Sequence, residues 1–274
     1  DNEEGIPSGE TPDHEDPATA PAVLEELEPK GIFAFAKGAR PGTCLHEIFE
    51  RCDFTRTGEK ETGELVKQVL QRYDLLDPGR HFGELDPQRD VWERVKRVTS
   101  APLPGDGFSL NRVPVENRLN AWQFNLPLSR LSPSSLGDLF ARHAEGTMAG
   151  EYAHRLRDLD NKTVHGFLTG FVDLVFEHGG RWYIIDWKSN HLGNSAGDYN
   201  QDALWRAMVD HHYVLQYHLY CAALHRFLGV RLKGYDYEQH VGGVFYAFLR
   251  GIDGDSDSGW YHDRPSLALV EALI

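Results

Sequence analysis

Two β-rich runs separated by a short glycine turn constrain this chain more than any other feature. The runs are FLTGFVDLVF over 167–176 and WYIIDWK over 182–188, and the sequence EHGG over 177–180 lies between them. Aromatic and β-branched residues favour strands, and a glycine-rich turn between two strands is typical of a hairpin. The sequence therefore predicts an antiparallel hairpin.

The hairpin carries charged residues at positions that indicate a site. Because side chains alternate between the two faces of a strand, Asp186 and Lys188 point to one face and Trp187 to the other. Asp173 lies on the partner strand, where cross-strand pairing can bring it beside Asp186. A charge inside such apolar strands is costly unless it is paired or binds a metal.

Two adjacent carboxylates repel each other, and together they suit a hard divalent cation, Mg²⁺ or Mn²⁺. Phosphodiester hydrolysis needs such a cation to polarise the phosphoryl group and activate water, and Lys188 would orient the nucleophile or meet the developing negative charge. A D-x-K sequence on a strand is more often a solvated surface ion pair. Here the apolar run before Asp186 is typical of a buried strand, which favours a nuclease site.

Helices and further strands are expected on both sides of the hairpin. The first helix is expected over 43–53, with Thr43 as its N-cap and with His46 off its apolar stripe. We further expect a helical middle over 62–97, a strand over 118–126, helices over 136–144, 201–209 and 213–228, and a last buried strand over 244–249. The helix over 213–228 is expected to be strongly amphipathic. This order predicts an α/β or α+β sheet layered with helices.

Three side chains outside the hairpin are candidates for the same site. Gln216 and Tyr220 stand four residues apart on a predicted helix and therefore share one of its faces. His46 offers a nitrogen ligand to the same metal. Taken singly, each of the three is more often a packing or structural residue.

The N-terminal 30 residues differ in composition from the rest of the chain. They hold ten acidic residues, one lysine and five prolines, so we expect a disordered acidic linker over 1–30 and a nuclease domain over 31–274. The whole chain carries a net charge of −14, of which −9 lies in this segment. The remaining −5 argues against a diffuse basic DNA-binding surface, and we expect the domain to need help in holding DNA.

Several protein classes are excluded by what the sequence lacks. Three cysteines cannot form a four-cysteine zinc or iron–sulfur site, and they favour a reducing, cytoplasmic setting. No segment is apolar enough for a membrane span, and no phosphate-binding loop for ATP is present. The chain begins at Asp1 instead of Met, so we expect a fragment of a longer polypeptide.

Four ordered motifs resemble the RecB-type nuclease domain of the restriction-endonuclease-like PD-(D/E)xK superfamily. They are GTCLHEIFE, GFVDLVF, IIDWKSN and LQYHLY, and the resemblance covers residues 40 to 274. It implies a central mixed sheet flanked by helices, with a helical N-terminal portion. It also implies metal ligation by His46, Asp173, Asp186 and the main-chain carbonyl of Trp187, with Lys188 as the catalytic lysine.

The resemblance assigns further positions less completely. Gln216 and Tyr220 would form a Q-x-x-x-Y element that lines the active-site cleft and contacts DNA or the catalytic groups. Tyr199 and Gln201 match a Y-x-Q element whose role the chemistry does not assign. Gln123 occupies a position at which relatives often carry glutamate, so a second metal would lack an extra carboxylate.

The function implied is that of a Mg²⁺-dependent DNA nuclease of the exodeoxyribonuclease V type, part of a bacterial cytoplasmic helicase–nuclease for double-strand-break repair and recombination. The implied partners are single-stranded or linear DNA, RecC-like and RecD-like subunits, and RecA, with ATP bound outside this chain. The alternative is a catalytically silent nuclease-fold module that binds DNA or protein. The presence of Asp173, Asp186 and Lys188 together argues against that alternative.

Overall fold

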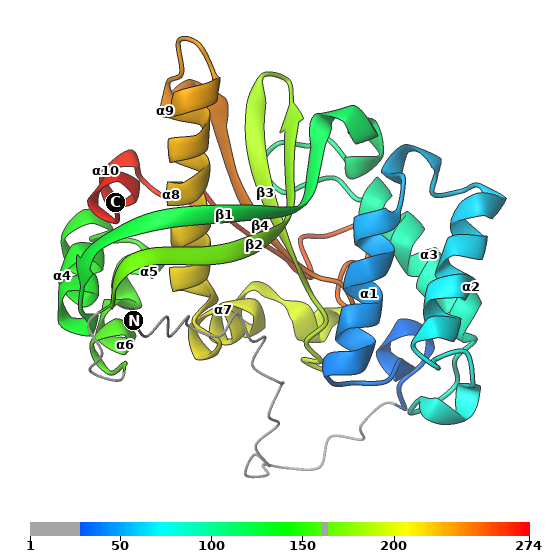
Figure 1. Cartoon of the computed structure of the whole chain (residues 1–274). Helices are drawn as coiled ribbons and strands as arrows, with labels where there is room; N and C mark the ends of the chain where they lie inside the picture. The colour runs from blue at the N-terminus through cyan, green and yellow to red at the C-terminus, as the bar shows by residue number, and fades with distance from the viewer. Residues whose placement is uncertain (1–27, 160–163) are drawn as a thin grey trace, which may run out of the picture.

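The predicted hairpin forms the middle of a five-stranded mixed sheet (Figure 1). The computed structural model describes residues 28–159 and 164–274, so the acidic linker expected over 1–30 lies almost entirely outside the described residues. The strands are β1 (Arg118–Leu131), β2 (Val164–His178), β3 (Arg181–Lys188), β4 (Val241–Phe248) and β5 (Trp260–Asp263).

Helices account for most of the remaining regular structure. The α-helices are α1 (Ala39–Arg51), α2 (Lys60–Arg72), α3 (Pro87–Ser100), α4 (Pro133–His143), α5 (Met148–Glu151), α6 (Ala153–Arg157), α7 (Gln201–Asp210), α8 (Tyr213–Arg231), α9 (Tyr237–His240) and α10 (Leu267–Ala272). The short 3₁₀ helices are η1 (Gly31–Ala34), η2 (Phe54–Arg56), η3 (Pro78–Arg80), η4 (Leu110–Arg112), η5 (Val115–Asn117) and η6 (Ala196–Tyr199). None of the helices in these described ranges has the length and apolar content needed to cross a membrane.

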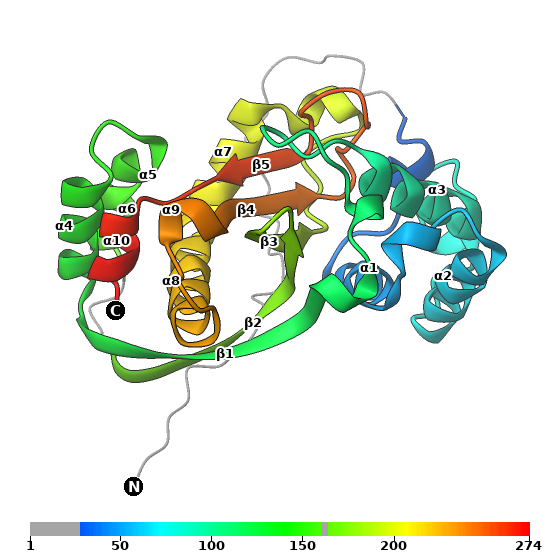
Figure 2. The same cartoon turned by 90° about the horizontal axis from the view of Figure 1, so that it is seen from above.

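The sheet has the strand order β1-β2-β3-β4-β5, and only the β3–β4 pair is parallel. The turn between β2 and β3 contains Gly179 and Gly180 with φ angles of +61° and +82°, which residues with a Cβ rarely adopt. The crossover from β3 to β4 runs through α7 and α8 (Figure 2). The predicted hairpin and the mixed α/β class are therefore confirmed.

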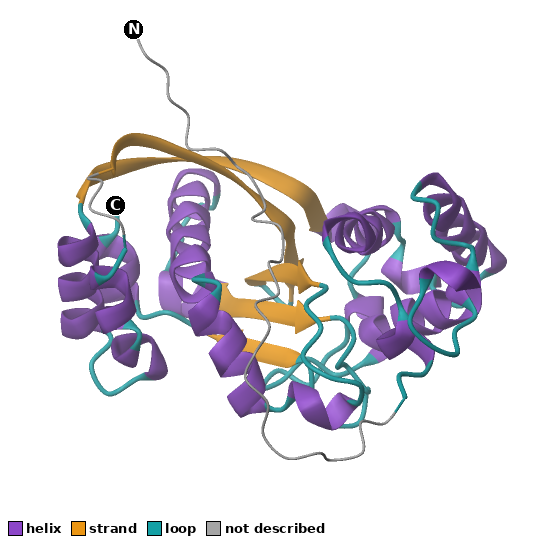
Figure 3. Cartoon of the chain, turned by 90° about the horizontal axis from the view of Figure 1, so that it is seen from below, coloured by secondary structure: helices purple, strands orange, loops and turns teal. Residues whose placement is uncertain are grey.

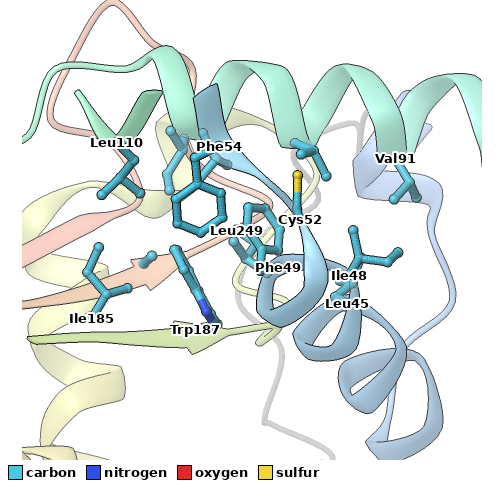
Figure 4. Packing of buried hydrophobic residues seen from close by; sticks show 14 of the residues in the cluster. Leu45, Ile48, Phe49, Cys52, Phe54, Val91, Leu110, Ile185, Trp187 and Leu249 are labelled. Atoms are coloured by element: carbon cyan, nitrogen blue, oxygen red, sulfur yellow. The ribbon is translucent and has the colours of Figure 1, made fainter. Parts of the chain in front are cut away.

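Helices α1–α3 lie at one end of the molecule and α4–α6 with α10 at the other, while α7 and α8 lie between them beside the sheet (Figure 3). On the α1–α3 side, Phe49 stacks on Trp187 with ring centroids 4.7 Å apart, and Phe54 meets the same indole edge-on (Figure 4). A second buried cluster surrounds α8 and includes Val172 and Ile184. Two apolar cores thus meet at the hairpin and hold it from both faces.

The first helix is correctly predicted, but Thr43 is not its N-cap. Helix α1 begins at Ala39 after Gly38, and the Thr43 hydroxyl lies inside the helix, where it donates to the Ala39 carbonyl over 3.0 Å. Pro41 is tolerated because the first turn of a helix leaves its N–H groups without intrahelical partners. The three cysteines are free and buried, as expected for inert thiols.

The predicted amphipathic character of α8 is wrong, because α8 is covered on several sides. Phe227 packs against Trp122 of β1, and His218 packs against Phe140 of α4. Tyr217 meets Tyr246 of β4 from another direction. A helix that neighbours enclose in this way needs no polar face, so sequence periodicity cannot identify its exposed side.

Strand β4 is not the last strand, in contrast to the prediction. The short strand β5 pairs antiparallel with it, from Val244–Asp263 to Ala247–Trp260. A four-residue strand gives too short an alternation for sequence periodicity to detect. The strand expected over 118–126 is also longer in the structure, because β2 continues alongside it as its partner (Figure 2).

Arg250, just after β4, ties the N-terminal segment to the sheet. Its guanidinium is buried and donates to the carbonyls of Ile32, Phe35 and Ala36 over 2.7–2.9 Å, and to that of Ser189 over 3.1 Å. These acceptors are neutral, so carbonyl dipoles stabilise the charge together with the Phe35 ring, whose centroid lies 5.8 Å from the guanidinium carbon. The arginine therefore fixes the segment that leads into α1.

We expect Arg250→Met to lower the free energy of unfolding by about 3 kcal/mol or more, because it leaves buried carbonyls without donors. Urea unfolding followed by circular dichroism measures the loss. The same substitution at the exposed Arg206 is the matched control and should change stability by less than about 0.5 kcal/mol. Equal stability of the two variants would contradict this role.

The buried imidazole of His218 makes stability depend on pH. Burial lowers its pKa from 6.5 to about 4, while its Nδ1 lies 2.7 Å from the Val214 carbonyl. Between these two pH values the unfolded chain binds more protons than the folded chain, so stability falls as the pH drops below 6.5.

We expect His218→Gln to remove about 2 kcal/mol of the stability difference between pH 7.5 and pH 5.0. Urea titrations of both proteins at the two pH values measure the difference, and contributions from the other histidines cancel in the comparison. The exposed His154→Gln is the control and should keep the wild-type pH dependence. An unchanged pH dependence in His218→Gln would refute the assignment.

Candidate active site

The two carboxylates of the hairpin lie opposite each other where the pairing of β2 with β3 ends. The pairing of Leu174 with Ile185, continued by one residue, brings Asp173 across from Asp186. Asp173 Oδ2 accepts a hydrogen bond of 2.8 Å from the Trp187 N–H, which anchors its side chain to β3. The cross-strand register therefore explains why these two acids lie next to each other.

The residues of β2 around Asp173 pack in different cores. Leu174 packs in the α1 core, whereas both Val172 and Val175 pack in the α8 core. On the neighbouring strand β1, Ala121 has a φ of +47°, an unusual conformation for a residue with a Cβ. Backbone irregularity of this kind is frequent at functional sites.

Asp186 and Lys188 share one face of β3, as predicted. Lys188 Nζ lies 2.6 Å from Asp186 Oδ2, and the two side chains are only 12% and 5% exposed. Trp187 points the other way, into the α1 core. Burial of this ion pair at the end of a strand separates it from the solvated surface pair that D-x-K residues usually form.

Helix α1 brings His46 to the same place. His46 Nδ1 lies 3.4 Å from Asp173 Oδ1, and both side chains keep about a quarter of their surface exposed. The helix is held there by Phe49 against Trp187, one turn further along. Gly42 allows a close approach, since a Cβ at this position would lie 2.8 Å from the Ser189 hydroxyl.

Helix α8 supplies the fourth side of the site. Gln216 Oε1 lies 3.5 Å from Lys188 Nζ, and the Tyr220 hydroxyl interacts with the Asp186 carboxylate. Tyr220 is oriented by Phe124 of β1, whose ring meets it edge-on. The structure therefore brings together the side chains of His46, Asp173, Asp186, Lys188, Gln216 and Tyr220.

The electrostatics of these groups follow from burial and mutual contact. Burial raises the pKa of Asp186 to about 6, an effect that Lys188 reduces and Asp173 reinforces. Burial also opposes ionisation of Asp173, but His46, the Trp187 N–H and Lys188 hold its pKa below the ordinary value. At neutral pH, the buried carboxylate of Asp186 and the half-buried carboxylate of Asp173 therefore carry charge side by side.

The two cationic partners are stabilised in the charged form. Burial alone lowers the pKa of Lys188, yet the adjacent Asp186 raises it above the ordinary value. In the same way, burial lowers the pKa of the His46 imidazole, but the adjacent Asp173 raises this pKa above the ordinary value. The acids and bases thus compensate each other in pairs.

The donor set fits a hard divalent cation in its chemistry. Asp186 Oδ2 is buried and accepts no hydrogen bond from the described residues, although Lys188 is its ion-pair partner. Two carboxylates and one imidazole are suitable ligands for Mg²⁺ or Mn²⁺. In residues 28–159 and 164–274, however, no three acidic, histidine or cysteine side chains already converge on a common point as a metal centre.

Three positions from the sequence lie outside this contact network. Gln123 is exposed on β1, opposite Phe171. The Tyr199 hydroxyl donates to the Asn190 carbonyl, and Gln201 donates to the Trp260 carbonyl over 3.0 Å. The Y-x-Q element therefore holds the loop that follows Lys188 against β5, which is a structural role.

Sequence reasoning missed two tyrosines in the site. The Tyr246 hydroxyl donates to Gln216 Oε1 over 2.7 Å, and the Tyr213 ring centroid lies 3.7 Å from Lys188 Nζ. Tyr246 lies in the apolar strand sequence VFYAFL, where a tyrosine is an ordinary core residue, so the sequence did not identify it as a site residue. Only the parallel pairing of Tyr246 with Asp186 reveals its position.

A mixed sheet with two carboxylates and a lysine at the ends of its central hairpin defines a restriction-endonuclease-like nuclease fold. Residues 29–266 match the PD-(D/E)XK nuclease superfamily. The chain belongs to this superfamily, which confirms the resemblance inferred from its motifs.

Nearly the whole chain is similar to the RecB subunit of RecBCD enzymes. It is 38% identical over 261 residues to RecBCD enzyme subunit RecB of Escherichia coli (strain K12), across 94% of this chain and 20% of the relative. For the RecB subunits of Haemophilus influenzae and Mycobacterium tuberculosis, the identities are 34% and 30%, across 92% and 88% of this chain. The chain spans about a fifth to a quarter of the length of these relatives.

Proposed function

We propose that this chain is a Mg²⁺-dependent DNA nuclease that hydrolyses phosphodiester bonds. The observation that supports this most is the buried contact between Lys188 and Asp186, with Asp173 opposite and His46 beside it. Two carboxylates packed beside a buried lysine are costly for stability, so their presence where the pairing of β2 with β3 ends is best explained by chemistry. Membership of a nuclease superfamily supports the same reaction class.

In this proposal, His46, Asp173, Asp186 and the main-chain carbonyl of Trp187 hold the cation. When bound, Mg²⁺ supplies Lewis-acid polarisation of the phosphoryl group and of the attacking water. Lys188 then presents an ammonium to the nucleophile or to the negative charge that develops on the phosphoryl oxygens.

Residues around this centre keep it in place. The Trp187 N–H holds Asp173, and Tyr220 contacts Asp186 from α8. Gln216 faces the lysine on the same helix, and we propose that Gln216 and Tyr220 line the cleft in which DNA lies. Gln123 is exposed on β1 and offers no extra carboxylate, which agrees with a single metal.

We further propose that the chain is the nuclease module of a cytoplasmic RecBCD-type helicase–nuclease in double-strand-break repair and recombination. The similarity to RecB subunits of RecBCD enzymes supports this proposal. The proposal includes RecC-like and RecD-like subunits and RecA as partners. The activity is of the exodeoxyribonuclease V type, and its ATP dependence belongs to sequence outside this chain. Residues 31–274 carry a net charge of −5, so partner subunits would deliver single-stranded or linear DNA to the site.

We expect the wild-type chain to cut end-labelled single-stranded DNA with Mg²⁺ and without ATP. Asp186→Ala and Lys188→Ala should each lower the rate by at least about 100-fold, since each removes a charge that acts in the transition state. Gel analysis of the labelled products measures the rates. The exposed Asp202→Ala is the matched control and should cut like the wild type.

Equal cutting by all four proteins would mean that a contaminant causes the activity. Absence of cutting by the wild type, together with DNA or protein binding, would favour the alternative of a catalytically silent nuclease-fold module. Circular dichroism of each variant separates loss of activity from loss of folding.

We expect Mg²⁺ to raise the unfolding temperature of the wild type by about 3 °C at ten times its dissociation constant, because a ligand of the folded state stabilises that state. Asp173→Asn and Asp186→Asn should lose most of this increase, whereas Asp202→Asn should keep it. Differential scanning calorimetry with and without MgCl₂ measures the shifts. Equal shifts in all four proteins would place cation binding elsewhere.

A further inference from the structure

Besides the carboxylates of Asp186 and Asp173, the ammonium of Lys188 has neutral neighbours. Gln216 Oε1 lies 3.5 Å from Nζ, the Tyr213 ring centroid 3.7 Å and the Tyr246 ring centroid 5.1 Å. Ammonium groups within about 6 Å of an aromatic centroid are attracted by the ring face, most strongly where water is excluded. These contacts come from α8 and β4, the elements that cover β3.

Tyr246 contacts the end of the Gln216 amide that faces the lysine. Tyr246 is buried on β4, directly beside Asp186 in the parallel register, and its hydroxyl donates to Gln216 Oε1 over 2.7 Å. An ammonium only donates, so the amide must present its oxygen to Lys188. The hydroxyl and the ammonium therefore favour the same orientation of the amide.

Tyr213 is itself held in place at the start of α8. Its hydroxyl lies 3.5 Å from Asn190 Oδ1, two residues after Lys188, and its ring stacks on His211. The ring of Tyr246 is also a neighbour, with centroids 5.5 Å apart. The aromatic surface next to the ammonium is therefore preorganised by contacts on several sides.

The chemistry of the proposed reaction explains why neutral groups are needed here. If Asp186 binds a cation, its negative charge is shared, and Lys188 loses part of its main attraction. A further carboxylate near the lysine would repel the DNA phosphate, whereas an amide oxygen and two aromatic rings would not. Neutral anchors can hold the ammonium in both situations.

We propose, on the basis of the proposed nuclease function, that Tyr213 and Tyr246 are positioning residues for Lys188. Tyr246 orients Gln216 through its hydroxyl, and Tyr213 holds the ammonium through its ring. Both act through the lysine and leave DNA binding unchanged.

We expect Tyr246→Phe to lower kcat by about 10-fold and Tyr213→Leu by about 30-fold, with KM for DNA within about twofold of the wild type. Tyr213→Phe keeps the ring and should restore kcat to within about threefold. In a Lys188→Ala background, the same tyrosine variants should cause no further loss. Steady-state cleavage of labelled single-stranded DNA measures these constants.

Tyr237→Phe is the matched control. It removes a buried tyrosine hydroxyl whose 2.7 Å hydrogen bond to the Pro265 carbonyl lies outside the site, so it should affect stability and leave kcat unchanged. A similar fall of kcat in this control, or a further loss in the Lys188→Ala background, would overturn the positioning role. Wild-type kcat in both Tyr246→Phe and Tyr213→Leu would overturn it as well.

A second measurement does not require cleavage. Acetylation of Lys188 by acetic anhydride, followed by mass spectrometry and referred to the exposed Lys67, should be about fivefold faster in Tyr213→Leu than in the wild type, because the ring restricts access. An unchanged labelling rate overturns the positioning proposal even if the chain cuts DNA. Faster labelling in a chain that does not cut DNA refutes the proposed function and leaves the lysine contacts established.

Discussion

The register between β2 and β3 is the constraint on which the rest of the site depends. Because side chains alternate along β3, one register places Asp186 and Lys188 toward α8 and Trp187 toward α1. A slip by one residue would exchange these faces, burying the charges in the α1 core and exposing the indole. The packing of Phe49 on Trp187 therefore protects the geometry of the charged face, although neither ring touches it.

The protein accommodates two buried cations in different ways. Arg250 is surrounded by carbonyl groups, and nothing near it requires its charge to be available for chemistry. Lys188 instead has the carboxylate of Asp186 in contact, that of Asp173 nearby and several neutral neighbours, a set that leaves the ammonium able to act on a substrate. The first arrangement suits structure, and the second suits a group that must respond when charge develops nearby.

Much of the site could be predicted because its signals are local. The D-x-K spacing, the hairpin and the four-residue spacing of Gln216 and Tyr220 are all visible within short windows of sequence. The contribution of Tyr246 could not be predicted, because it depends on a parallel pairing between strands that three α-helices and a 3₁₀ helix separate in the chain. The amphipathic character predicted for α8 is wrong for the same reason, because β1, α4 and β4 all pack against this helix. Contacts between residues far apart in the chain thus determine the position of Tyr246 and the environment of α8, which short stretches of sequence do not reveal.

The location of the site between two cores also explains how its charges are tolerated. Asp173 and Asp186 lie where the two cores meet at the hairpin, so each acid can reach a partner from a different layer: His46 from α1 for one, Lys188 and α8 for the other. Within a single core, the same acids would have had only apolar neighbours and a much larger desolvation cost. A junction of two layers supplies polar partners from both sides, while each layer keeps its own apolar packing. The site is therefore a product of the way the two halves of the fold meet at the hairpin.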